Sequence, residues 1–134
     1  MRIDVDHMDE LWQHVENADL VTSRLGLTPS LHDAEILGIT LSRDGPPSAT
    51  LTLKAVPYDP TGRGGTYLFT LLFKSVAKVS LKHFNEQNVI WGLYVKLEGN
   101  EKLLVIQPIY GVEGGFSFCE AIVLDASTLR AEQP

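Results

Sequence analysis

Three side chains that could bind a metal ion or move a proton lie close together in the segment PSLHDAE: His32, Asp33 and Glu35. Imidazole nitrogens and carboxylate oxygens are common ligands of divalent metals. On a regular strand, however, successive side chains point to opposite faces, so Asp33 and Glu35 would share one face and His32 would lie on the other. The three could meet one ion only if His32 lay in a turn. We therefore expect no metal and no cofactor here, but a polar entry to a strand, with Asp33 bonding turn amides and Glu35 exposed or paired.

Other residues with reactive side chains do not complete a catalytic motif. Cys119 lies among apolar residues in FSFCEAIVL, where we expect a buried thiol and not an ionised nucleophile. His7, His14 and His83 lack the HxxxH or HxH spacing of metal motifs. The glycine-rich segment Thr61–Thr66 lacks the lysine and serine or threonine that end a phosphate-binding loop, and it precedes a strand. We assign no catalytic residue and do not expect an enzyme.

The elements that must position these side chains begin with a helical segment at residues 6–26. Its first part carries apolar residues at helical spacing: Met8, Leu11, Trp12 and Val15. A second short helix is expected to follow, with Asn17 as its N-cap and Gly26 as the glycine that ends it. The sequence therefore predicts one or two short helices before the sheet.

From residue 34 to residue 125 the period of the apolar residues is two, which is typical of strands. Leu37, Ile39 and Leu41 are expected to share one face, and RDGPPS predicts a turn to a second strand with Leu51, Leu53 and Ala55 inward. The segment TYLFTLLF is apolar on both faces, which predicts a central strand covered on both sides.

The sequence predicts a single domain over residues 1–134. The expected fold is α+β and mainly antiparallel β, with the N-terminal helices packed on a curved meander sheet of about six or seven strands. The helices would lie against the second face of TYLFTLLF, which carries Leu68 and Leu72, and Trp12 and Trp91 would belong to the core. The tail 126–134 shows no comparable pattern and is expected to fray.

Composition and charge exclude several classes of function. The 134 residues are 44% hydrophobic and 21% charged, as in an ordinary globular domain. Seventeen acidic and eleven basic residues give a net charge of −6, which disfavours a nucleic-acid or membrane partner and permits a basic protein partner. A single cysteine, no export signal and only short apolar stretches lead us to expect a soluble, cytoplasmic protein.

The order of these segments resembles the immunity protein 50 family of bacterial polymorphic toxin systems. The segments that carry the resemblance are LWQHVENADLVTSRLG, PSLHDAEILGITLSRDGP and VAKVSLKHFNEQNVIWGLYV, together much of the chain. The resemblance implies a mostly β fold and a protein that neutralises a co-encoded toxin by binding it. The shared segments are scaffold motifs, so the resemblance implies no toxin-binding residue, and VPYDPTGRGG lies outside them.

An inhibitor that acts by binding needs a complementary exposed surface, and acidic residues could steer it toward a basic toxin. The carboxylates that we consider first for partner binding are Asp33, Glu35, Glu113 and Glu120. The interpretation that we favour over this one is that the four are ordinary solvated carboxylates and that the loop Asp59 to Gly65 makes the contact. A metal-assisted hydrolase or a small-ligand-binding domain that uses His32, Asp33 and Glu35 is the alternative function, and a homodimer is left open.

Overall fold

The computed structural model describes residues 8–25, 31–56 and 65–129. It is a mainly β protein with one large, mostly antiparallel sheet and one short α-helix. The strands are β1 Asp9–Glu10, β2 Val15–Glu16, β3 Glu35–Ser42, β4 Ser48–Ala55, β5 Thr66–Lys74, β6 Ala77–Lys82, β7 Val89–Glu98, β8 Glu101–Tyr110, β9 Glu113–Phe118 and β10 Glu120–Leu129. The helices are η2, a 3-10 helix at Leu11–His14, and α1, an α-helix at Asp19–Leu25.

The sheet has ten strands, so the expectation of six or seven was wrong. Two of the additional strands, β1 and β2, come from the N-terminal segment that was expected to be helical. A further strand arises because the alternating segment FSFCEAIVL is interrupted at Cys119 and contributes to both β9 and β10. Strand β10 also continues to Leu129, so residues 126–129 of the predicted frayed tail are part of the sheet.

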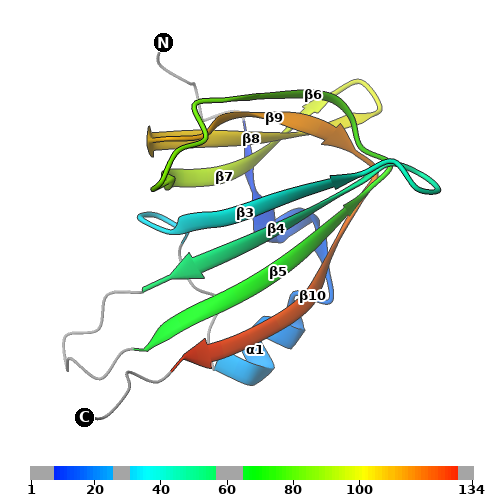
Figure 1. Ribbon diagram of the computed structural model, residues 1–134. Coiled ribbons are helices and arrows are strands. Elements are labelled where there is room, and N and C mark those ends of the chain that lie inside the picture. The colour runs from blue at the N-terminus through cyan, green and yellow to red at the C-terminus, as the bar shows by residue number, and fades with distance from the viewer. Residues whose placement is uncertain (1–7, 26–30, 57–64, 130–134) are drawn as a thin grey trace.

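The sheet closes on itself around one core. Strand β5 continues into β6 through Ser75 and Val76, and β9 continues into β10 through Cys119. Because β5 pairs with β10 and β6 pairs with β9, these four strands form one two-stranded ribbon bent at a corner, where their ends meet at the right of Figure 1. Strands β4 and β8 pair with the two sides of this ribbon, and β3 and β7 join them to each other. The joint between β3 and β7 is narrow, with the single register pair Glu35 and Val89.

The β3–β4 hairpin confirms the prediction made from alternation and turn residues. Its turn contains Asp44 and Gly45, and Gly45 has a φ of +67°, which a glycine adopts without strain. The inward residues of β4 are fully or almost fully buried: Ala49, Leu51, Leu53 and Ala55. In β3 a bulge between Ile36 and Gly38 shifts the alternation of the side chains. Leu37 is therefore exposed, and the expectation that it shares a face with Ile39 was wrong.

The first predicted helix is not formed. Strand β1 pairs with β7 and strand β2 pairs with β10, so the N-terminal segment fills sheet edges, and only the four residues of η2 are helical. Pairing with strands that are distant in sequence outweighs the helical spacing of the apolar residues. Leu11 is fully buried, and the Trp12 ring contacts Phe69 edge to face with centroids 5.8 Å apart. The N-terminal segment therefore packs on the Phe69 face of β5, not on the Leu68 and Leu72 face.

The second predicted helix is present as α1, which lies against β10. Asn17 does not cap it with its side chain. The Asn17 amide instead donates to the carbonyl oxygen of Val123 and accepts from the Val123 N–H, both at 3.0 Å, while its own φ is +50°. This exchange fastens the turn before α1 to β10. The proposed terminator, Gly26, lies outside the described residues.

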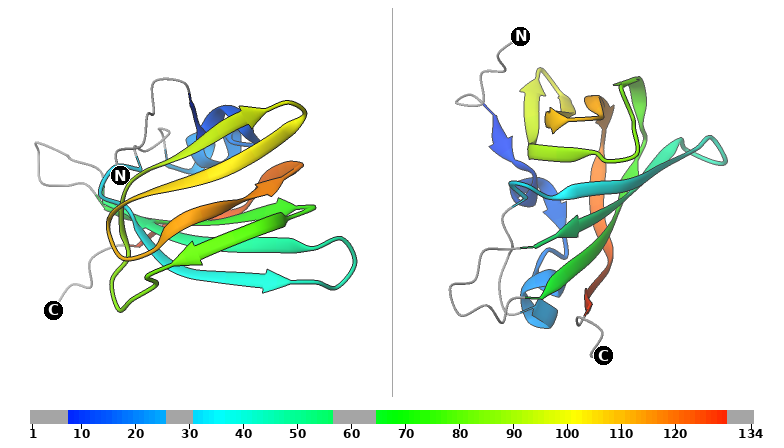
Figure 2. Two further views of the ribbon diagram at one scale, coloured as in Figure 1. Left: turned by 90° about the horizontal axis from the view of Figure 1, so that it is seen from above. Right: turned by 60° about the vertical axis from the view of Figure 1, so that its left-hand side comes forward.

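The core lies between the two halves of the folded sheet, which Figure 2 shows from above and from the side. Phe73 of β5 contacts Phe116 and Phe118 of β9 edge to face, with ring centroids 5.2 and 5.1 Å apart. Strand β5 is central, between β4 and β10, as predicted. Its second face is not fully covered, because Leu68 and Leu72 are only half-buried.

Candidate functional site

The predicted His32 and Asp33 lie in a tight turn before β3. The Ala34 N–H donates to the Leu31 carbonyl at 3.0 Å, and Asp33 has a φ of +66°. Leu31 and Ala34 are buried, so the turn directs His32 and Asp33 outward. Backbone hydrogen bonds of 2.9 Å from Asp33 N–H to Ile90 O and from Ile90 N–H to Ala34 O hold the turn against β7. The backbone that carries both side chains is therefore held in place by pairing with β7.

Trp91 lies next to this turn and is exposed over 51% of its surface. The expectation that Trp91 belongs to the core was wrong. A register shift between Ile90 and Gly92 leaves Trp91 as the additional residue of β7 opposite β8, and such a bulge redirects the side chain. The His32 ring packs edge to face on the indole with centroids 4.4 Å apart, and His32 Nδ1 lies 3.3 Å from the Trp91 carbonyl oxygen. An exposed tryptophan is thus held by a histidine from the neighbouring turn.

Two of the predicted carboxylates, Asp33 and Glu35, lie close to His32 in the sequence, and each has a basic neighbour. An Asp33 carboxylate oxygen lies 3.5 Å from His32 Nε2, and a Glu35 oxygen lies 3.7 Å from Lys54 Nζ. Asp33 approaches the imidazole, whereas we had expected it to bond turn amides. Glu35 is paired, in agreement with the prediction. Both pairs are close enough to orient the side chains, and both are too exposed to water to add much stability.

A second exposed aromatic residue extends the surface across β7 to β8. Glu35 is the register partner of Val89, and Val89 is the register partner of Tyr110, so the three share one face of the sheet. Tyr110 is 48% exposed, and its hydroxyl donates to Gln87 Oε1 at 2.6 Å. We call these neighbouring residues the Trp91 surface: His32, Asp33, Glu35, Val89, Trp91 and Tyr110.

A buried asparagine supports the Trp91 surface from below. Asn88 is 2% exposed, and its Oδ1 accepts hydrogen bonds from the N–H groups of Asn85 at 2.9 Å and Val112 at 3.0 Å. Its Nδ2 donates to the Asn85 carbonyl, and its own carbonyl accepts from the Ile36 N–H, both at 2.9 Å. The turn at Gly111 packs so closely that a Cβ there would lie 2.7 Å from Asn88 Oδ1. Asn88 thereby joins β3, β7 and the β8–β9 turn, a role that we did not predict.

The other two predicted carboxylates lie elsewhere. Glu113 pairs with His83, with Oε1 3.1 Å from Nε2, and Glu120 pairs with Lys74 at 3.8 Å. Lys74 is the register partner of Ser48, whereas Glu35 is the partner of Lys54. Glu35 and Glu120 therefore sit at opposite ends of β4, roughly 20 Å apart at about 3.3 Å per residue. The four carboxylates do not form one patch.

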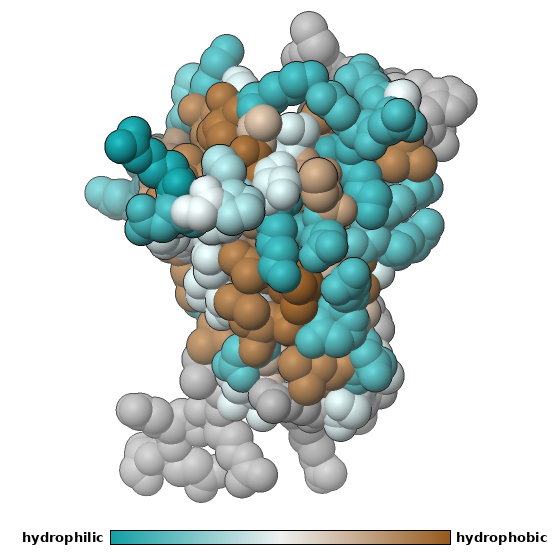
Figure 3. Space-filling model, turned by 90° about the vertical axis from the view of Figure 1, so that its right-hand side faces the viewer, coloured by the Kyte–Doolittle hydropathy of each residue, from teal (hydrophilic) through white to brown (hydrophobic). Residues whose placement is uncertain are grey.

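Cys119 is exposed, so the prediction of a buried thiol was wrong. The chain turns a corner at this residue, where the Cys119 N–H donates to the Lys74 carbonyl at 2.9 Å. An open depression of about 520 Å³ adjoins it, lined by Pro46, Ser48, Leu72, Lys74, Ser75, Cys119 and Glu120. Figure 3 shows a side of the molecule on which apolar surface gathers in the lower half and polar residues border it.

Within the described ranges, no group of three or more His, Cys, Asp or Glu side chains is arranged to hold a metal ion. Most of the loop Asp59 to Gly65, and of the glycine-rich segment Thr61–Thr66, lies outside those ranges, which omit residues 57–64. None of the helices in the described part is long and apolar enough to cross a membrane. A scan against protein-family models, a search of curated proteins and a search of solved structures each gave no match.

Proposed function

We propose that this chain is a bacterial immunity protein that neutralises a cognate polymorphic toxin by binding it through the Trp91 surface, without catalysis. The observation that supports this most is the half-exposed Trp91, which His32 holds beside Asp33 and Glu35. Tryptophan and tyrosine are enriched among the residues that dominate the energy of protein interfaces. In this proposal Trp91 and Tyr110 contribute most of the affinity, and the protein acts in the cytoplasm of the cell that makes the toxin.

The carboxylates give the proposed interface its charge preference. Asp33 and Glu35 lie at the margin of the Trp91 surface, and the whole chain carries a charge of −6. Charges at the margin of an interface mainly change the association rate and its dependence on salt. We therefore propose a toxin domain with a basic surface. Glu120 is too far from Glu35 to act at the same contact, and in this account it adds only to the long-range field.

Co-expression tests the function. The neighbouring gene's product would be expressed alone and with the wild-type chain, and growth and co-purification would be scored. The variant Trp91→Ala should lose rescue and co-purification. Leu124→Ala is the matched control, because Leu124 on β10 is also 51% exposed but lies outside the Trp91 surface. Toxicity that the wild-type chain does not relieve would refute the immunity function for this gene pair, whereas equal rescue by both variants would refute only the surface.

A second test addresses the charges. The double variant Asp33→Asn with Glu35→Gln should bind the same toxin with a lower association rate and a weaker dependence on ionic strength. The control pair is Glu113→Gln with Glu120→Gln, which makes the same change in net charge at two positions outside the Trp91 surface. A larger effect of the control pair would show that the toxin approaches another side of the molecule.

A further inference from the structure

Half of strand β3 has an open edge. Strand β3 pairs with β4 from Glu35 to Ser42 except at the bulged Leu37, but its register pairing with β7 is limited to Glu35 and Val89. Beyond the bulge at Leu37, no strand in the described part of the chain pairs with the other side of residues Gly38 to Ser42. Alternate backbone N–H and C=O groups in this half therefore point away from β4, toward the open side. Such an edge is a template for another strand.

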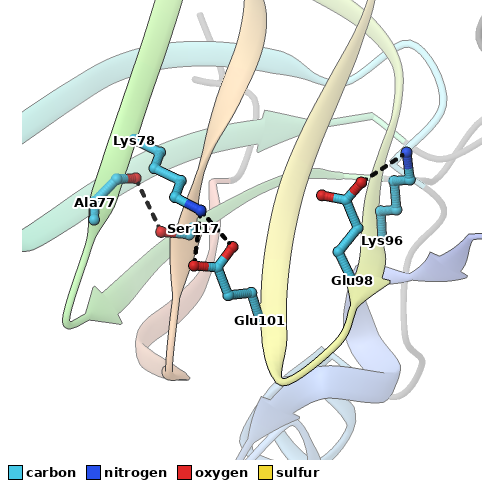
Figure 4. Close-up of polar contacts among 6 residues, drawn as sticks. All are labelled: Ala77, Lys78, Lys96, Glu98, Glu101 and Ser117. Carbon is cyan, nitrogen blue, oxygen red and sulfur yellow. Dashed lines mark hydrogen bonds and ion pairs between the residues drawn. The ribbon is translucent and has the colours of Figure 1, made fainter.

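The other edges of the sheet carry features that oppose such pairing. Strand β6 is shifted in register between Ala77 and Ser80, and Lys78 within the shift has a φ of +53°. The Lys78 ammonium donates to both carboxylate oxygens of Glu101 at 2.8 Å, and Ser117 Oγ donates to the Ala77 carbonyl at 3.1 Å, as Figure 4 shows. At the opposite end of the sheet, β2 has only two residues, and α1 lies against β10. Irregular backbone, lysines and very short edge strands are recognised protections.

The open half of β3 has none of these protections. Its sequence, Gly-Ile-Thr-Leu-Ser, contains no lysine and no proline, and its central residues have high strand propensity. Leu41 is 51% exposed although it lies on the same face of β3 as the core-contacting Ile39. Figures 1 and 2 show the turn of the β3–β4 hairpin projecting beyond the neighbouring strands.

We propose that a second copy of this chain covers the edge, with the two β3 strands antiparallel and a two-fold axis at Thr40. In this register Thr40 faces Thr40 of the second copy on the outer face, and each Leu41 faces the other copy's Ile39 on the core face. Threonine pairs and aliphatic pairs across strands are favourable, and no like charges face each other in this segment.

Self-complementarity is the reason to choose a second copy over an unrelated strand. A two-fold contact requires that one segment match itself when reversed, and Ile39-Thr40-Leu41 does so, with a threonine between two aliphatic residues of similar size. The Leu41 side chain, which is exposed in a single copy, is then covered by the second copy. The proposal is independent of the toxin-binding function, because it concerns only the free protein.

The mass of the full chain in solution tests the proposal. Sedimentation equilibrium over a range of concentrations should give a mass that rises from monomer toward dimer. Thr40→Lys places two lysines opposite each other at the axis and should leave a monomer with unchanged far-UV circular dichroism and melting temperature, since Thr40 is exposed. Ser80→Lys on β6 is the control and should still dimerise. A wild-type chain that stays monomeric at every concentration, or a dimer that Ser80→Lys abolishes and Thr40→Lys preserves, would overturn the proposal.

Charge exchange tests the position of the axis. Thr40→Lys and Thr40→Glu should each be monomeric alone, and an equimolar mixture should form a heterodimer, because residue 40 faces only residue 40. A mixture that remains monomeric while the wild type dimerises would show that the contact lies elsewhere.

Discussion

The rings of His32 and Trp91 meet edge to face at 4.4 Å, and His32 Nδ1 lies 3.3 Å from the Trp91 carbonyl oxygen. The two residues are 59 positions apart in sequence, and the contact is made where β3 and β7 join. The ring contact restricts the indole, and the short polar distance ties the imidazole to the backbone that carries it. An exposed aromatic side chain that is already held in place loses less conformational entropy when a partner binds it.

The exposure of Trp91 leads to a prediction about stability. Leu71→Ala removes a fully buried side chain from β5 and should lower the free energy of unfolding by about 2–5 kcal/mol. Trp91→Ala should cost about 1 kcal/mol or less, because half of the side chain is already in water. Urea denaturation followed by circular dichroism measures both changes. Similar losses for the two variants would mean that the indole is part of the core.

Asn88 should be the polar residue on which the architecture of the Trp91 surface depends most. Asn88→Ala leaves the N–H groups of Asn85 and Val112 without their acceptor, and we expect a loss of about 1–3 kcal/mol. Amide hydrogen exchange should show faster exchange at Val112. Asn85→Ala is the control, since its side chain is exposed and accepts from the adjacent Glu86 N–H. Equal losses for the two variants would contradict the assigned role of Asn88.

Tyr94 gives a prediction at alkaline pH. Burial, with a further contribution from the Glu10 carboxylate, raises the pKa of Tyr94 above its ordinary value of 10.0. Above that pH the unfolded chain releases the Tyr94 proton while the folded chain retains it, so stability falls. The stabilisation is therefore complete below the ordinary pKa and is lost as the pH rises through the raised pKa of the folded state.

The variant Tyr94→Phe isolates this effect. Urea midpoints at several alkaline pH values should decline less steeply for Tyr94→Phe than for the wild type. Tyr110→Phe, which changes an exposed hydroxyl on the next strand, should retain the wild-type decline. Parallel curves for wild type and Tyr94→Phe would show that the Tyr94 environment does not favour the neutral phenol.

The sequence was most informative where local rules agree with one another. In the β3–β4 hairpin, alternating apolar residues, Asp44 and Gly45 all predict a turn between two strands, and the structure contains it. It was misleading at the N-terminus, because Leu11 and Trp12 have helical spacing but belong to a segment that pairs with distant strands. No local pattern shows which strand edges will be open to accept such a segment.

The candidate site was predictable only in part for a related reason. Asp33 and Glu35 could be placed at the start of a strand, but a bulge opposite β8 decided that Trp91 points outward beside them. A bulge inserts one residue into a strand and turns the side chain of that residue to the other face of the sheet. Neither the alternation of apolar residues nor the composition marks the position of this bulge in β7. The distance between Glu35 and Glu120 likewise depends on strand order, which the sequence alone does not give.

The measurement that tests the proposed function most directly is the dissociation constant for the purified product of the neighbouring gene. Isothermal titration calorimetry would compare wild type, Trp91→Ala and Leu124→Ala, after circular dichroism has shown that all three are folded. We predict stoichiometric binding by the wild type, a loss of affinity of at least about 30-fold for Trp91→Ala, as expected for a residue worth about 2 kcal/mol at an interface, and little change for Leu124→Ala. Wild-type affinity in Trp91→Ala would contradict the account.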